Sequence, residues 1–141
     1  MNDVAANKKE SIERCIKQIH SYYHLPDTVP FEKNFLKQDA IAINIQRACE
    51  QTIDLANHTI RKYRLGMPKN SRDSFKILAA HQIISADIEK NLCNMIGFRN
   101  ILVHEYQQLD LNVMANIIEN NLNDLLVFTD CIFDYIKNPK S

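Results

Sequence analysis

Apolar residues recur at helical spacing along most of the chain. Within residues 3–23, for example, Ile12, Ile16 and Ile19 lie three or four positions apart. Side chains with this spacing share one face of an α-helix. No stretch shows the strict alternation of apolar and polar residues that is typical of a half-buried strand. The pattern therefore predicts an all-α fold.

Turn-forming residues divide this pattern into five helices. Pro26 and Pro30 separate the first two helices, and Gly66 with Pro68 ends the second. The predicted helices cover, in order, residues 3–23, residues 32–64 or 38–64, residues 71–84 or 73–84, residues 85–105, and residues 110–137. Five helices joined by short connections predict an up-and-down bundle.

Polar residues before two of these helices are suitable N-caps, because their side chains can accept a hydrogen bond from a free backbone N–H group of the first turn. They are Ser71 or Asp73 for the third helix and Asp110 for the last, while Ser85 or Asp87 opens the fourth. We therefore expect the fourth helix to begin at about residue 85 and the last at about residue 110.

The size of the chain favours one domain. It has 141 residues, of which 45% are hydrophobic, with only two glycines and four prolines. This length is enough to enclose a single core of ordinary size, so we expect one domain spanning residues 1–141. The last helix has a broad apolar face, and part of that face could serve a homodimer.

The four cysteines show no metal-binding or disulfide pattern. Cys15, Cys49, Cys93 and Cys131 lie far apart, without a Cys-x-x-Cys pair, and each falls in an apolar helical stretch. We interpret them as reduced core residues. The N-terminus is polar, and no run reaches the roughly 18 apolar residues that a membrane-spanning helix needs. We therefore expect no membrane association and a cytoplasmic protein.

The fourth predicted helix carries an arginine in an unexpected position. On a helical wheel with Arg99 as the reference direction, seven apolar or aromatic residues fall within about 60° of it. These are Ile88, Leu92, Met95, Ile96, Leu102, Val103 and Tyr106. Removing a guanidinium from water is unfavourable by roughly several kcal/mol unless it is paired or faces a wet cleft. The position of Arg99 therefore indicates a function.

His104 follows Arg99 by five residues and in a regular helix points about 140° away from it, within about 40° of Asn100. Tyr106 would return to within about 20° of Arg99. One helix would therefore not present all three side chains on a single stripe. Either the helix ends near Glu105 and the chain turns, or two copies of the helix cross, so that the arginine of one approaches the histidine of the other.

These residue types suit metal-independent cleavage of RNA. Histidine, whose pKa lies nearest neutral pH, can take the 2′-hydroxyl proton or protonate the leaving 5′-oxygen. Arginine can stabilise the negative charge that gathers on the phosphate in the transition state. His104 and Arg99 fit these two catalytic roles, and Asn100 could hold the imidazole or a phosphate oxygen. No carboxylate cluster lies near them at metal-ligand spacing, so we expect neither a metal site nor another cofactor.

The overall charge does not indicate a nucleic-acid-binding protein, because 17 basic residues balance 17 acidic ones. Any RNA contact must therefore be local. One basic run could hold an RNA backbone; it comprises Arg61, Lys62, Arg64, Lys69, Arg72 and Lys76. The alternative is a solvated face that also complements the dipole at the end of the second helix.

The arrangement Arg-x4-His-x-Tyr, here Arg99, His104 and Tyr106 with Asn100 beside the arginine, resembles the motif of the HEPN superfamily. Within it the chain is most similar to the HepT-like ribonuclease toxins, which are encoded beside a minimal nucleotidyltransferase antitoxin in type II/VII-like toxin–antitoxin modules. The resemblance implies a HEPN-like homodimer and a metal-independent endoribonuclease toxin. It also implies that the partner silences the toxin by adding AMP to the hydroxyl of Tyr106.

Two interpretations remain open from the sequence. Either the protein is a ribonuclease toxin, or it is a non-catalytic helical adaptor that binds nucleotides or a nucleotidyltransferase through the same polar motif. Tyr106 likewise could be the modified residue or only a packing residue whose hydroxyl is hydrogen-bonded at the rim.

Overall fold

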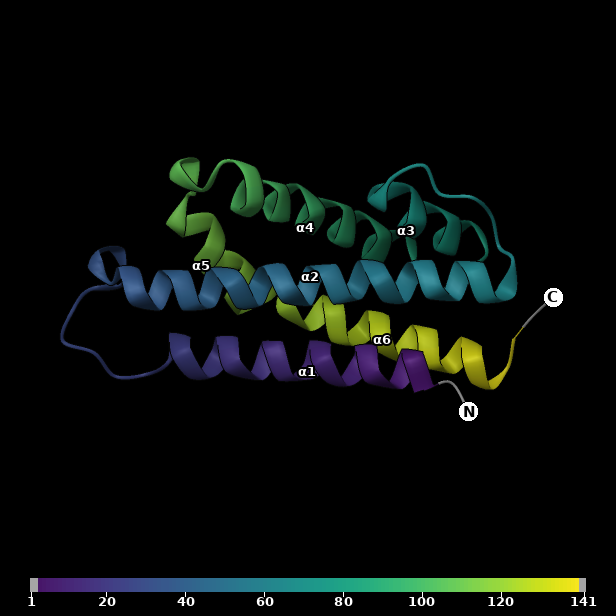
Figure 1. The fold of residues 1–141 in the computed structure, drawn as a ribbon, viewed down its shortest axis with the longest axis horizontal. Helices are drawn as coiled ribbons and strands as arrows, with labels where there is room; N and C mark the ends of the chain where they lie inside the picture. The colour runs from purple at the N-terminus through teal and green to yellow at the C-terminus, as the bar shows by residue number, and fades with distance from the viewer. Residues whose placement is uncertain (1–2, 140–141) are drawn as a thin grey trace.

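The computed structural model describes residues 3–139, which fold into six α-helices and two short 3-10 turns. Their order is α1 (Asp3–Tyr23), η1 (Phe31–Lys33), α2 (Phe35–Tyr63), α3 (Ser71–Ala80), α4 (Ala86–His104), η2 (Tyr106–Gln108), α5 (Leu111–Asn120) and α6 (Leu122–Lys137). No strand occurs in this part of the chain. The predicted all-α fold is confirmed, and the long helices lie roughly along one direction (Figure 1).

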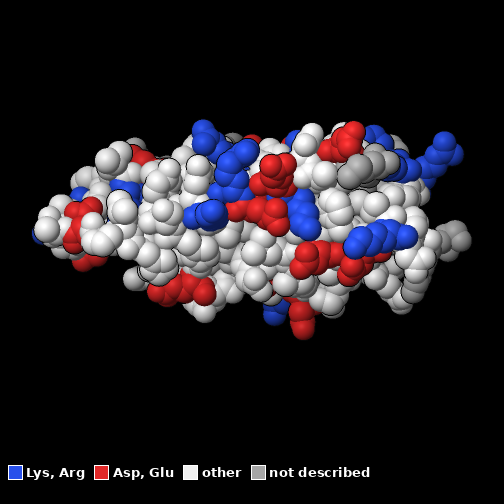
Figure 2. All heavy atoms as spheres, turned by 90° about the horizontal axis from the view of Figure 1, so that it is seen from below, with Lys and Arg blue, Asp and Glu red and all other residues white. Residues whose placement is uncertain are grey.

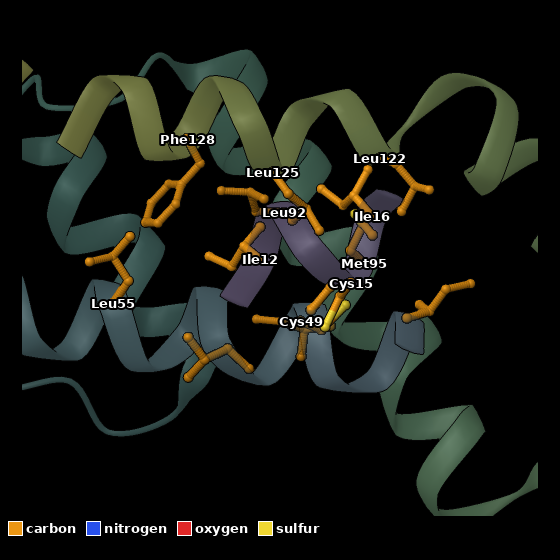
Figure 3. Close-up of a cluster of buried hydrophobic side chains, with 14 of the residues drawn as sticks. Ile12, Cys15, Ile16, Cys49, Leu55, Leu92, Met95, Leu122, Leu125 and Phe128 are labelled. Atoms are coloured by element: carbon orange, nitrogen blue, oxygen red, sulfur yellow. The ribbon is translucent and has the colours of Figure 1, made fainter. Parts of the chain in front are cut away.

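The core lies between α1, α2, α4 and α6. Figure 3 shows side chains from all four helices pointing toward one another. Among them, Ile12 on α1, Leu92 on α4 and Phe128 on α6 are each at most 1% exposed. Each helix therefore buries one apolar stripe, as its sequence pattern requires, and the four stripes meet in one core.

The central helix of the bundle is α2, and α4 lies against it in the opposite direction. Near the middle of the bundle, Cys49 of α2 lines the same small cavity as Leu92 and Met95 of α4. Beyond the end of α4, Tyr106 reaches Asp39 in the first turns of α2. The C-terminal end of α4 is therefore placed beside the N-terminal end of α2 (Figure 1).

The last predicted helix is in fact two helices. Asp110 caps α5 as expected, with its side chain accepting a hydrogen bond from the backbone N–H of Asn112. The helix then stops at Asn120, and α6 begins at Leu122 in a different direction (Figure 1). Asparagine competes with helix formation because its side chain bonds to nearby groups. Here Asn121 bonds to the carboxylate of Asp124, so the prediction of one helix over residues 110–137 was wrong.

The boundaries of two other helices also differ from the prediction. The N-cap of α3 is Asn70, not Ser71 or Asp73, because the Asn70 side chain accepts the N–H of Asp73. The Asp73 carboxylate in turn accepts the backbone N–H of Lys69. This helix ends at Ala80 instead of residue 84, since Gln82 takes a left-handed conformation with φ of 62°. The second helix begins after a cap at Asn34, between the two predicted starting points.

The four cysteines are free thiols in helices. Cys15 and Cys49 are buried, as expected for core residues, whereas Cys93 and Cys131 are half-buried. None of the helices described in residues 3–139 is both long enough and apolar enough to span a bilayer.

Candidate functional site

The fourth helix ends inside the predicted motif. Its cap is Ser85, whose hydroxyl accepts the N–H of Ile88, and its last backbone bond joins the N–H of Glu105 to the carbonyl of Ile101. Glu105 leaves the helical conformation with φ of −139°, and Tyr106 begins the short turn η2. The chain therefore turns after His104, as the first of the two sequence-based arrangements requires, and this turn is compatible with the second, the crossing of two copies.

Arg99 lies on the side of α4 that faces α2, and its side chain is half-buried. Its Nε atom is buried and has no hydrogen-bond partner. Residues 3–139 provide no hydrogen bond or ion pair to this side chain. Of its three nitrogens, only Nε is both buried and without a partner. The tip of the guanidinium therefore reaches solvent, without a carboxylate to neutralise it.

The charge of Arg99 affects the pKa of Cys49 across the interface of α4 and α2. Burial raises the pKa of the Cys49 thiol to about 12, while the nearby Arg99 charge acts in the opposite direction and lowers it. The effect of burial is larger than that of the Arg99 charge, because a thiolate in the core loses its hydration. Cys49 is therefore a protonated packing residue and not a counter-ion for Arg99.

His104 is the last residue of α4, and its side chain is exposed; Asn100, one turn earlier, is half-buried. Neither side chain makes a hydrogen bond within the described residues. Because α4 is a continuous helix up to His104, the imidazole leaves it about 140° away from Arg99. The structure therefore places the two predicted catalytic residues one and a half turns apart on different sides of the same helix.

Tyr106 does not continue the stripe of Arg99 but is turned back onto α2. Its hydroxyl donates a hydrogen bond of 2.5 Å to the Asp39 carboxylate. Burial and this bonded carboxylate raise the pKa of Tyr106 to about 12, because ionisation would place two negative charges side by side. Tyr106 is nevertheless 39% exposed, so the residue lies at the surface and not in the core.

Asp39 is a site residue that was not predicted from the sequence. It is separated from Tyr106 by 67 positions, and nothing in a single sequence pairs two such distant residues. A weaker signal was present, because a helical wheel over α2 places Asp39 within about 60° of Leu36 and Ile43. An acid between apolar residues is the same kind of anomaly that singled out Arg99.

The basic run is divided by the fold. Arg72 lies across α4, where its Nε donates a hydrogen bond of 3.3 Å to the carbonyl of Cys93. A methyl group at Gly97 would lie only 3.0 Å from a terminal nitrogen of Arg72. Gly97 is about 20° from His104 on the helical wheel, so Arg72 is on the side of α4 that carries the histidine. The remaining five residues have exposed side chains at the end of α2, in the next loop and on α3: Arg61, Lys62, Arg64, Lys69 and Lys76.

Charges of both signs are mixed on the side of the bundle formed by α1 and α6 (Figure 2). That face therefore offers no continuous basic surface to a nucleic acid. Within residues 3–139 no group of three or more histidine, cysteine, aspartate or glutamate side chains is arranged to hold a metal ion.

Comparison with known proteins identifies the arrangement. The family described as Ribonuclease HepT-like matches residues 12–132. The mRNA nuclease HepT of Shewanella oneidensis is 43% identical over 132 residues, which are 94% of this chain and 98% of that protein. The tRNA nuclease HepT of Aphanizomenon flos-aquae is 26% identical over 106 residues, or 75% of this chain and 69% of that protein.

A solved structure extends the similarity to the fold. It is the tri-AMPylated Shewanella oneidensis HEPN toxin in complex with MNT antitoxin, which is 42% identical and superimposes with a TM-score of 0.88. The match covers 95% of this chain and 99% of that one. Together with the helical architecture and the Arg99–Tyr106 motif, these matches confirm the resemblance: the chain belongs to the HepT-like ribonuclease family.

Proposed function

We propose that this chain is a metal-independent endoribonuclease that acts as the toxin of a toxin–antitoxin pair. The observation that carries the proposal is Arg99, a permanent charge in an apolar stripe with a buried, unpartnered Nε and a tip that reaches solvent. A phosphate is the natural partner of such a group, because a guanidinium matches its oxygens in geometry and charge. Two relatives are named nucleases of mRNA and of tRNA, and both substrates share the RNA phosphodiester.

His104 and Arg99 would act on that phosphodiester in different ways. The exposed imidazole of His104 would move a proton to or from the reacting oxygens. Arg99 would stabilise the charge of the transition state, and Asn100 would support the imidazole or a phosphate oxygen. Since the two catalytic side chains leave α4 on different sides, we further propose a homodimer in which Arg99 of one copy and His104 of the other share a cleft.

The RNA backbone would follow the His104 side of α4. Arg72 lies on this side at Gly97, about 10 Å along the helix from His104. That is close to the spacing of one or two phosphates along a single strand. The exposed residues Lys69 and Lys76 would add charge beside it, whereas Arg61, Lys62 and Arg64 lie where α2 ends and would contact RNA only outside the cleaved segment.

The same protein would be silenced through Tyr106. A homologous toxin has been seen tri-AMPylated and bound to its MNT antitoxin. We propose that a cognate minimal nucleotidyltransferase binds this chain and adds AMP to the hydroxyl of Tyr106, a residue that is 39% exposed. The phosphates would lie near the guanidinium of Arg99 and compete with RNA for it. The pair would work in the cytoplasm, with the whole chain, residues 1–141, acting as one domain.

The nuclease proposal is tested by cleavage in a chelator. The purified protein should cut RNA in EDTA, and neither Arg99→Ala nor His104→Ala should cut, although both should keep the helical circular dichroism of the wild type. Expression of the chain alone should stop growth, and expression with the neighbouring nucleotidyltransferase gene should not. Equal activity in the wild type and His104→Ala would instead favour a non-catalytic adaptor.

The shared cleft is tested by mixing the two inactive variants. If Arg99 and His104 of different copies form each site, a heterodimer of Arg99→Ala with His104→Ala contains one complete site and one that lacks both residues. Co-expression should therefore restore about half of the wild-type activity per heterodimer. Activity that stays absent in a mixture of proven heterodimers would mean that each site takes both residues from one copy.

A further inference from the structure

Tyr106 and Tyr23 each donate a hydrogen bond to a carboxylate. Tyr106 bonds to Asp39 at 2.5 Å, and Tyr23 bonds to Glu119 at 3.3 Å. The bond of Tyr23 links the end of α1 to α5, and its ring packs edge-on against the ring of Phe31. The bond of Tyr106 involves the residue that we propose to be modified, and its surroundings are different.

A surface cavity of about 330 Å³ is lined by both members of the bonded pair, Tyr106 and Asp39. Its walls are formed by Asp39, Ala42, Ile43, Gln46, Leu102 and Tyr106. Asp39 is the only charged residue among them, and it is exposed to solvent. A phosphate could therefore approach the hydroxyl, and the proton of the hydroxyl already points at a carboxylate oxygen.

The modification that we propose for Tyr106 requires this proton to be removed. A neutral phenol is a weak nucleophile, and it must lose its proton as the new bond to phosphorus forms. The raised pKa of Tyr106 means that almost none of the hydroxyl is ionised in advance at neutral pH. A base in hydrogen-bond contact must therefore accept the proton during the reaction, as an aspartate does for the substrate hydroxyl in protein kinases.

We propose that Asp39 is the proton acceptor in the nucleotidylation of Tyr106, so that the toxin itself provides the base for its own silencing. This inference rests on the proposed modification of Tyr106. The Tyr106 oxygen attacks the α-phosphorus of a nucleoside triphosphate held by the partner enzyme, and a new P–O bond forms. The bond from the α-phosphorus to the bridging oxygen breaks, pyrophosphate leaves with the electron pair, and the hydroxyl proton passes to the Asp39 carboxylate.

Other charged groups near Tyr106 are less suitable. Glu105 precedes it in the chain and is exposed, and His104 is exposed at the end of α4. Neither forms a hydrogen bond to the Tyr106 hydroxyl, and neither contributes to its raised pKa, to which Asp39 alone among the charged groups of α2, α4 and η2 contributes. The geometry therefore selects one carboxylate.

The test uses the full chain in a preformed complex with its nucleotidyltransferase, mixed with Mg²⁺ and ATP, and follows the intact mass of the toxin. Wild type should gain AMP, and Tyr106→Phe should not. Asp39→Asn keeps an oxygen that accepts a hydrogen bond but is not basic, so the first addition should slow by about 100-fold or more. Glu119→Gln, the matched change at the Tyr23 pair, should leave the rate unchanged, and Asp39→Glu should recover part of it.

The pH dependence separates a base from a residue that only orients the tyrosine. Without a base only the tyrosinate reacts, so the rate of Asp39→Asn relative to Glu119→Gln should rise about tenfold per pH unit between pH 7 and 9. A constant ratio, or a rate in Asp39→Asn equal to that of wild type, would overturn the role of Asp39 and leave the modification standing. No AMP on wild type, or AMP that persists in Tyr106→Phe, would overturn both.

Discussion

The two halves of α4 follow opposite rules, although they belong to one continuous helix. In the first half, Leu92 and Met95 are buried, and their side chains point into the apolar core toward Leu125 of α6 and Cys49 of α2 (Figure 3). In the second half, Arg99 has a buried Nε without a partner, and His104 is exposed without a bond. The first half stabilises the fold, whereas the second half keeps polar groups unsatisfied.

This contrast teaches where function lies in a small helical bundle. A buried polar atom without a hydrogen bond is unfavourable by about 1–3 kcal/mol, so natural proteins keep few of them. One helix can carry such a defect near its end because its other half is firmly packed. The predictions below change one half at a time and ask whether stability and activity respond separately.

The largest effect should follow Arg99→Met, which removes the unsatisfied charge from the second half of α4. Cleavage of RNA should fall by about 10²–10³-fold, as expected when a preorganised electrostatic group is lost. The free energy of unfolding should stay the same or rise, since methionine fills a similar volume without a desolvated charge. Urea denaturation and single-turnover cleavage measure the two quantities. A clear loss of stability would mean that Arg99 has a structural partner.

The opposite change is Leu92→Ala in the first half. Leu92 is 1% exposed, and its truncation should lower the free energy of unfolding by about 2–5 kcal/mol through lost burial and a cavity. Because the second half of α4 is untouched, the folded fraction should cleave RNA at the wild-type rate. If cleavage per folded molecule fell as strongly as in Arg99→Met, the two halves would not be independent.

A smaller effect should separate the two parts of the basic run. Replacing Arg72 by Gln removes one charge from the His104 side of α4, so the slope of log affinity against log salt should become shallower by about one unit. Arg64→Gln, at the end of α2, is the matched control and should change the slope less. Gly97→Ala should act in the same direction as Arg72→Gln, since the new methyl group would push on the Arg72 guanidinium. Fluorescence anisotropy at several salt concentrations measures the slopes.

The smallest effect concerns the ionisation of Tyr106. Its pKa, about 12 in the folded protein, lies above the ordinary tyrosine value of about 10. The native state therefore favours the un-ionised hydroxyl, and this contribution to stability is complete below pH 10 and disappears as the pH rises through 12. An absorbance titration should show a late tyrosine in wild type that is absent in Tyr106→Phe. In Asp39→Asn the same group should titrate earlier, and an unchanged titration would contradict the Asp39–Tyr106 bond.

Much of the fold could be predicted from the sequence, because hydrophobic spacing is a local property of the chain. The pattern gave α1 with both of its ends, and it placed the start of α4 near Ser85. The helix break at Asn120 and Asn121 was missed, because apolar residues continue at helical spacing on both sides of it, so α5 and α6 were predicted as one helix. The anomalous position of Arg99 was also visible, since it depends only on neighbours along one helix.

The tertiary structure alone decided which distant groups meet. It brought Asp39 to Tyr106 across 67 residues, and it placed Arg72 on the His104 side of α4. Such contacts depend on the packing of α2 and α3 against α4, and helical periodicity contains no information about them. The sequence by itself determined the helices, the core stripes and the residues able to do chemistry. The packing of the helices determined which of those residues act together.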